Sequence, residues 1–334
     1  MLKTAEAVSI GHPDKTADYI SSYILDRFIE EDPKVRYAVE VMIKDNTVIL
    51  GGEIESAKTL PYLDEYVRQA LREIGYDEDY HQIWGDKAIN INKLNVINLI
   101  GLQSVEIGQG TAQDGWGDQG VFVGYACQGQ NHINQELFYA KKLNNALYEK
   151  ARQSKNLGLD IKTQISIDEN GHITTAIVAI PMLKSENLND FISNVLKQKP
   201  DEIIINGTGI YQTHSSVADC GITGRKLACD FYSTACPIGG GSPWTKDPSK
   251  ADLTLNLYAR YLALQNLKDN DECCVYLSSC IGQYKLPSAT IKTIQKGKIN
   301  VQSFDCKLKP NEIIELLGLN KPIYTQLCKN GLIG

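Results

Sequence analysis

The sequence predicts an α+β protein built from three similar units, each a mixed or antiparallel sheet with helices on one face. Two observations support this fold class. The order helix, β-hairpin, helix occurs three times, and the first helices of the three units begin near residues 15, 134 and 250. The hairpins require antiparallel pairing. Because side-chain identity between the units is weak, the repeat rests on element order.

The first unit covers residues 1–102. Apolar side chains at helical spacing predict a helix over residues 15–31, which ends at Asp32-Pro33. Two β-rich runs, RYAVEVMIK and TVILGGEIE, are joined at Asp45-Asn46 and predict a hairpin. Helical spacing returns over residues 60–74 and completes the unit.

The second and third units, residues 118–218 and 219–334, repeat this order. In the second, the helix NQELFYAKKLNNALYEKARQ precedes the strands KTQISID and ITTAIVAI and a helix near 188–199. In the third, Asp247 as N-cap and Pro248 at the first helical position predict a helix that runs to about Leu267. The strands CCVYLSSC and SATIKTI and the short helix PNEIIELLGL follow.

The connection between the first two units, residues 101–117, contains five glycines and no sustained periodicity. Irregular segments of this length are typical of disordered connections or of lids over active sites. Ile107 and Trp116 give the segment apolar side chains with which to close. We interpret residues 103–117 as a mobile lid.

Composition argues against several classes of protein. A formal charge of −6 and a pI near 5.5 are unlike those of general nucleic-acid or anionic-membrane binders. No apolar run approaches the roughly 20 residues that span a bilayer, and the N-terminus lacks a signal-peptide core, so we expect a cytoplasmic protein. The nine cysteines include no CxxC pair, which predicts reduced, mostly buried thiols.

The stretch from Asp219 to Asp252 predicts an anion site. Its Gly239-Gly240-Gly241 run lets the backbone approach an anion closely. Four flexible cations surround that run and could neutralise a polyphosphate: Arg225, Lys226, Lys246 and Lys250. A solvated surface loop is the alternative interpretation.

The segment Gly11-His12-Pro13-Asp14-Lys15 precedes the first helix, where backbone N–H groups and the helix dipole favour anions. His12 could donate to a phosphate, and Asp14 could hold a hard cation. The alternative is that Asp14 only caps the helix.

Four further charged residues are candidates whose spacing leaves a solvent-facing or turn role open. Glu40 and Glu53 lie on the first hairpin, the latter beside a double glycine that often marks a ligand contact. Asp118 lies in a glycine-dense turn and could bind an ammonium or a cation. Lys162 opens a strand and could bind a phosphate.

Four motifs, in this order and at compatible spacings, resemble the successive signatures of the S-adenosylmethionine synthetase (methionine adenosyltransferase) family: EAVSIGHPDK, GWGDQG, ADCGITGRK and GGGSPWTKDPSKAD. The resemblance extends from about Glu6 to about Tyr324 and implies three similar α+β domains. It implies attack of the methionine sulfur on the ribose 5′ carbon of ATP, followed by hydrolysis of the displaced tripolyphosphate. It also implies a pair of Mg²⁺ ions, K⁺, and a homodimer or homotetramer with the site between subunits.

The resemblance assigns roles to individual residues. The triphosphate contacts would come from His12, Lys162, Arg225, Lys226 and Lys246, with His12, Lys162, Arg225 and Lys246 as the catalytic group. Ser242 would be a further binding residue. The metal ligands would be Asp14 and Asp252 for Mg²⁺ and Glu40 for K⁺. The remaining nucleotide and methionine contacts would come from Glu53, Gln103, Asp118, Asp160, Ile210, Tyr211, Asp219 and Lys250.

The chain departs from the usual family pattern in several respects. Ile210-Tyr211 stands where arginine-phenylalanine is usual, Pro243-Trp244 makes the glycine-rich loop stiffer and bulkier, and Trp116 replaces a small lid residue. A catalytically weak, nucleotide-binding paralogue is one alternative function, disfavoured because every matched cation and carboxylate is retained. A phosphotransferase is another, disfavoured because the chain has no P-loop and no kinase signature.

Overall fold

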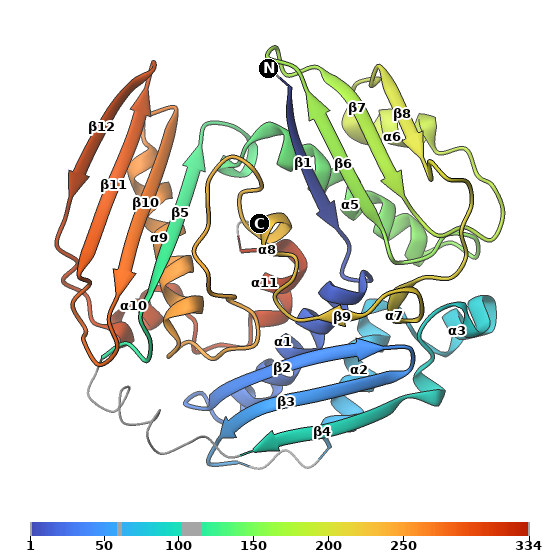
Figure 1. The fold of residues 1–334 in the computed structure, drawn as a ribbon, viewed down its shortest axis with the longest axis horizontal. Helices are drawn as coiled ribbons and strands as arrows, with labels where there is room; N and C mark the ends of the chain where they lie inside the picture. The colour runs from blue at the N-terminus through green and yellow to red at the C-terminus, as the bar shows by residue number, and fades with distance from the viewer. Residues whose placement is uncertain (1, 59–61, 102–114, 333–334) are drawn as a thin grey trace.

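The computed structural model describes residues 2–58, 62–101 and 115–332. Within these residues, three four-stranded sheets lie around a centre that contains the short helices α8 (Leu227–Asp230) and α11 (Tyr324–Asn330) (Figure 1). Each sheet packs against one long helix, and these are α1 (Pro13–Glu31), α5 (Gln135–Arg152) and α9 (Ala251–Leu267). The predicted α+β class is confirmed.

The first sheet has the strand order β4-β3-β2-β9, with bounds Asn95–Gly101, Thr47–Glu55, Arg36–Lys44 and Gly221–Ile222. The strands β2 and β3 form the predicted hairpin, whereas β4 runs parallel to β3. The alternation of β2 buries Tyr37, Val39, Val41 and Ile43 on the face toward α1. The opposite face remains open. The helices α2 (Leu63–Ile74) and α3 (Glu78–Trp84) and two short 3₁₀ helices, Gly85–Lys87 and Ile91–Lys93, precede β4.

The other two sheets are also built around predicted hairpins. The second has the order β1-β6-β7-β8, with bounds Lys3–Val8, Lys162–Ile167, Ile173–Ala179 and Glu202–Ile205. The third has the order β12-β11-β10-β5, with bounds Lys298–Ser303, Ser288–Gln295, Glu272–Ser279 and Gly120–Cys127. The remaining helices are α6 (Asn189–Leu196), α7 (Ser215–Ala218), α10 (Pro310–Leu317) and the 3₁₀ helix Gln130–His132.

The three units exchange strands in a cycle. The strand that precedes each predicted unit's first helix pairs with the hairpin of another unit: β1 with β6, β5 with β10, and β9 with β2. The predicted boundaries between 1–102, 118–218 and 219–334 therefore do not separate the three sheets. The exchange brings β9, and the cation-bearing segment that follows it, onto the first sheet next to α1 (Figure 1).

The predicted start of the third long helix is wrong. Helix α9 begins at Ala251, with Lys250 as its N-cap residue, and not at Pro248. Asp247 makes a local and a long-range contact, because its Oδ1 accepts the backbone N–H of Ser249 at 2.8 Å and its Oδ2 accepts that of Tyr37 at 2.7 Å. Local capping rules could not reveal the long-range contact.

The prediction that Trp116 belongs to a mobile lid is also wrong. Trp116 is buried in the core of the third sheet, and its backbone N–H donates to the carbonyl of Gln283 at 3.0 Å. Residues 103–114 of the predicted lid lie outside the described residues.

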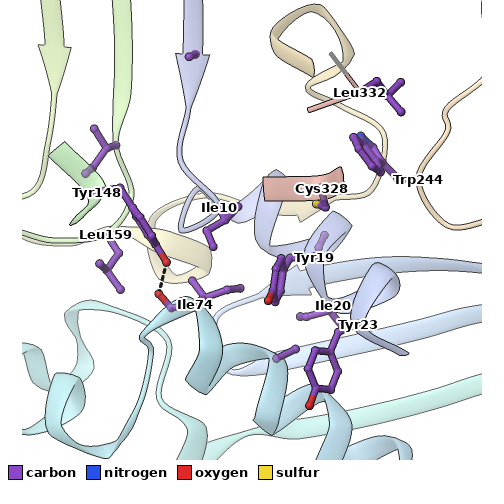
Figure 2. Close-up of a cluster of buried hydrophobic side chains, with 14 of the residues drawn as sticks. Ile10, Tyr19, Ile20, Tyr23, Ile74, Tyr148, Leu159, Trp244, Cys328 and Leu332 are labelled. Carbon is purple, nitrogen blue, oxygen red and sulfur yellow. Dashed lines mark hydrogen bonds between the residues drawn. The ribbon is translucent and has the colours of Figure 1, made fainter. Parts of the chain in front are cut away.

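Buried apolar side chains form two cores. The larger spans the first two sheets and their helices, and the smaller lies between α9 and the third sheet. In the larger core, the hydroxyl of Tyr148 on α5 donates to the carbonyl of Ile74 on α2 at 2.5 Å (Figure 2). All nine cysteines are free, and most are buried. Among the described residues, no helix combines the length and the apolar character needed to cross a membrane.

Candidate active site

His12 lies at the N-terminus of α1 and caps this helix, a role that the capping hypothesis gave to Asp14. Its Nδ1 accepts the backbone N–H of Asp14 at 3.2 Å, so the neutral ring carries its proton on Nε2. Burial, together with the charges of Lys226 and Lys162, lowers the pKa of His12 to about 3. The imidazole is therefore a neutral donor at physiological pH.

Asp14 joins α1 to the segment that follows β9. Its Oδ1 accepts the N–H of Ile222 at 2.9 Å, and its Oδ2 lies 2.5 Å from the ammonium of Lys226. Arg225 Nε lies 3.7 Å from Oδ1. Burial by itself would raise the pKa of Asp14, but the hydrogen bonds from Lys226 and Ile222 bring it below its usual range. The carboxylate is ionised and paired.

A second lysine–carboxylate group lies around the glycine-rich run. Lys246 forms an ion pair with Asp252 in the first turn of α9, and Lys250 Nζ lies 2.5 Å from Asp247 Oδ2. A Cβ on Gly241 would lie 1.9 Å from Asp252 Oδ1, so a larger residue at this position would displace the Asp252 carboxylate. At Gly240 a Cβ would meet nothing within 4 Å. Another group therefore approaches the backbone closely at Gly241 but not at Gly240.

Glu40 links the two groups. Its Oε1 accepts the hydroxyl of Thr245 at 3.0 Å, and its Oε2 accepts the hydroxyl of Thr223. Sequence reasoning missed both threonines. The sequence could have indicated them, because each motif has a hydroxyl residue close to a predicted cation. Thr223 lies two positions before Arg225, and Thr245 lies one position before Lys246.

Glu53 lies on the same open face of the first sheet. Ala38 on β2 pairs with Glu53 on β3 and, on its other side, forms a bridge with Lys246. The small side chain of Ala38 thus separates a carboxylate from an ammonium across adjacent strands. Glu53 is half-buried.

A further group extends from the second sheet. Asp160 accepts the N–H of Ser215 at 3.0 Å, and burial raises its pKa to about 6. The charges of Lys162, Asp219 and Lys226 also act on this carboxyl group, which places the predicted nucleotide residues near the Asp14 group. Lys162 is exposed at the first position of β6 and Asp219 is exposed after α7.

The residues predicted to contact adenine sit beside this group. Tyr211 is half-buried, and burial together with the charge of Asp160 raises the pKa of its hydroxyl. Its carbonyl accepts the N–H of Met182 at 3.0 Å. Ile210 is 52% exposed, so its side chain is available for contact.

Other predicted residues are less closely joined to the cluster. Ser242 accepts the N–H of Trp244 at 3.3 Å, and its hydroxyl lies 3.1 Å from where a Cβ on Gly224 would be. Asp118 is exposed on the third sheet's side, where its Oδ1 accepts the N–H of Gln119. Gln103 lies outside the described residues.

Comparisons with known proteins show the family of this chain. Models described as the S-adenosylmethionine synthetase N-terminal and C-terminal domains match residues 1–105 and 213–334. The S-adenosylmethionine synthase of Paramagnetospirillum magneticum is 32% identical over 368 residues, which cover 100% of this chain and 92% of the relative. The chain belongs to the S-adenosylmethionine synthetase family. It is an enzyme with methionine adenosyltransferase activity.

Two more synthetases show the same extent of similarity. The S-adenosylmethionine synthase of Wolinella succinogenes is 32% identical over 365 residues, with 100% of this chain and 92% of the relative covered. A solved structure described as an unusual S-adenosylmethionine synthetase from Campylobacter jejuni has a TM-score of 0.87 and 30% identity. That match covers 99% of this chain and 94% of the solved one.

Synthetases of this family typically use Mg²⁺ and K⁺. Within the described residues, no three His, Cys, Asp or Glu side chains gather closely enough to form a metal site. Mg²⁺ commonly binds through one or two carboxylates, with substrate phosphates and water completing its shell. The separate carboxylates of Asp14 and Asp252 fit that mode of binding. The all-oxygen set of Glu40, Thr223 and Thr245 fits a monovalent cation.

Proposed function

We propose that this synthetase joins ATP and methionine at the open face of the first sheet, between the N-terminus of α1 and the segments 222–226 and 241–252. The methionine sulfur attacks the ribose 5′ carbon, and the bond from that carbon to the triphosphate oxygen breaks. Water then cleaves the tripolyphosphate to pyrophosphate and phosphate. Thioether sulfur is already a nucleophile, so the barrier depends on alignment and on stabilisation of the leaving group.

The observation that carries this proposal is the presence of two lysine–carboxylate pairs in one site, Lys226 with Asp14 and Lys246 with Asp252. Asp14 and Asp252 would hold Mg²⁺, which supplies positive charge against phosphate oxygens when bound. With the carboxylates engaged in this way, both lysines would be free to donate to the phosphates. The site thus stays neutralised before substrate binds and becomes cationic toward the triphosphate afterwards.

The remaining side chains surround the reacting groups. The neutral imidazole of His12 donates from Nε2 toward the oxygen that leaves the 5′ carbon. Further phosphate donors are Lys162, Arg225, Ser242 and Lys250. The nucleotide would be held by Asp160, Ile210, Tyr211 and Asp219, and methionine by Glu53, Gln103, Asp118 and Lys250. Glu40, with the two threonine hydroxyls, would hold K⁺.

A second copy of the chain completes the site in this proposal. The open face of the first sheet carries an apolar row across all four strands, because Ile222, Met42, Ile49 and Ile97 are register neighbours. Met42 is 41% exposed and Ile97 is 38% exposed. Leu99, in the row that contains Glu40, is 65% exposed. Burying this face against an identical one would form a homodimer, which could pair further into a tetramer.

The compartment follows from the same chemistry. ATP, a substrate, is present in the cytoplasm, and nine free thiols suit a reducing compartment. We therefore propose that this synthetase works in the cytoplasm.

A single-turnover acid quench tests the order of the two steps. Tripolyphosphate should appear in step with S-adenosylmethionine and then decay to pyrophosphate and phosphate. Formation of ADP, or of S-adenosylmethionine without any tripolyphosphate, would contradict the proposal.

A further inference from the structure

The backbone of Lys246 is fixed on the edge of β2. The N–H of Val39 donates to the carbonyl of Thr245 at 2.9 Å, and the N–H of Asp247 donates to the carbonyl of Tyr37 at 3.0 Å. Lys246 itself forms the bridge with Ala38. The two residues before Lys246, Trp244 and Thr245, anchor this segment to different parts of the fold. Trp244 lies at a position where the chain departs from the usual family pattern.

Trp244 is the first anchor. Its side chain is buried within the larger core (Figure 2), and its Nε1–H donates to Asp230 Oδ2 at 2.8 Å. Lys15 Nζ lies 2.9 Å from that oxygen and 4.4 Å from the centre of the indole ring. An ion pair that is buried this completely holds its geometry only if its hydrogen bonds are satisfied, and Trp244 supplies one of them.

The same network reaches the other cation-bearing segment. Lys15 Nζ also lies 3.1 Å from Asp18 Oδ2, and Asp18 Oδ1 accepts the N–H of Gly224 at 2.8 Å. Gly224 directly precedes Arg225 and Lys226. Both phosphate-binding segments are therefore tied to one buried ammonium on α1.

Thr245 is the second anchor. Its φ is +77°, a left-handed conformation that is unfavourable for a β-branched residue. Its hydroxyl donates to Glu40 at 3.0 Å, and Thr223 donates to the other oxygen of the same carboxylate. Such backbone strain persists where the surrounding contacts hold the residue in its conformation.

We propose that Trp244 and Thr245 are positioning residues that set the ammonium of Lys246 for the triphosphate. Trp244 fixes the segment to the Lys15–Asp230 pair, and Thr245 fixes it to Glu40. A lysine on a rigid segment loses less freedom on binding an anion, so both anchors increase affinity without touching the ligand. This inference rests on the proposed function, in which Lys246 binds phosphate.

The test measures the binding of tripolyphosphate with Mg²⁺ by calorimetry, in tetramethylammonium chloride so that no alkali cation contributes. Trp244→Phe keeps an aromatic ring at this position but removes the N–H donor together with part of the buried indole. Its matched control is Trp84→Phe, because the buried Nε1–H of Trp84 has no hydrogen-bond partner within the described residues. Thr245→Gly relieves the left-handed strain and removes the hydroxyl, and Thr245→Ser restores the hydroxyl.

We expect Trp244→Phe and Thr245→Gly each to raise Kd by about three- to tenfold, the loss of one hydrogen bond. Trp84→Phe and Thr245→Ser should bind like the wild type. Thr245→Gly should melt no lower than the wild type, which a purely structural role for Thr245 would not predict. Unchanged Kd in Trp244→Phe and Thr245→Gly, with a wild type that binds, would overturn the positioning role alone. A wild type that binds no tripolyphosphate would overturn the proposed function as well.

Discussion

The ammonium of Lys226 lies 2.5 Å from Oδ2 of Asp14, whose side chain is almost completely buried. The cation proposed to bind phosphate and the carboxylate proposed to bind Mg²⁺ therefore satisfy each other without substrate. Removing either partner would leave the other with a poorly solvated charge. The pair keeps both groups ionised and in position until substrate and metal replace the contact.

Removing a phosphate cation should reduce the rate far more than stability. For Lys162→Met, Arg225→Leu and Lys246→Met we expect kcat/KM to fall by about a hundredfold or more, roughly 2.7 kcal/mol of transition-state stabilisation. Melting temperatures should change little, because none of the three side chains is a core contact. The control is Lys93→Met, which breaks an exposed pair with Asp86. Full activity in any of the three would remove that residue from the proposed site.

Two neighbouring glycines provide a matched pair of variants. In Gly241→Ala the added methyl group would lie 1.9 Å from Asp252 Oδ1, so the Asp252–Lys246 pair must move. We expect apparent Mg²⁺ affinity and kcat/KM to fall by about tenfold or more. Gly240→Ala adds the same group where nothing lies within 4 Å and should behave like the wild type. Equal behaviour of the two variants in Mg²⁺ titrations of activity would disprove a role for this close approach.

Stability should decrease at acidic pH through His214. Burial lowers the pKa of this imidazole to about 4, below the value of about 6.5 in the unfolded chain. Between these values the unfolded state binds the extra proton, so the free energy of unfolding falls as pH decreases from 6.5 to 4. Over this pH range the titration of His214 lowers the free energy of unfolding by about 3 kcal/mol.

Urea unfolding at several pH values checks this. His214→Gln should be less stable at pH 7, because it disturbs the contact with the Tyr80 hydroxyl, and should show a shallower decline toward pH 4. The control His172→Gln alters an exposed histidine beside Asp201 and should keep the full decline. An unchanged slope in His214→Gln would show that this residue does not titrate as inferred.

A charge in the apolar row should separate the proposed subunits. Met42→Glu places a carboxylate at the centre of the row Ile222, Met42, Ile49 and Ile97, where association would bury it. We expect sedimentation to show monomers and activity to fall with them. Leu316→Glu makes a comparable change at an exposed position on α10 and should remain associated. A wild type that is an active monomer would contradict the interface.

Much of the local structure could be predicted from the sequence. The turn at Asp45-Asn46 joins two runs of strong β character, and β6 begins at the predicted Lys162. These features depend on neighbours in the chain. The motif residues His12, Asp14, Arg225 and Lys246 could be singled out because each motif is short and chemically distinctive, and their roles stay predictions.

The arrangement of these pieces could not be predicted in the same way. The pairing of β1 with β6 joins residues far apart in sequence, and no local pattern specifies which hairpin a single strand will join. The hydroxyls of Thr223 and Thr245 gain a role only because the fold brings both to Glu40. The contact of Asp247 with the backbone of Tyr37 likewise depends on the fold.

The most direct test of the account is to incubate the purified protein with ATP, methionine, Mg²⁺ and K⁺ and to separate the products by chromatography. The account predicts S-adenosylmethionine, pyrophosphate and phosphate in equal amounts, all lost when methionine is omitted. Nucleotide binding without product, or ADP as the product, would contradict it.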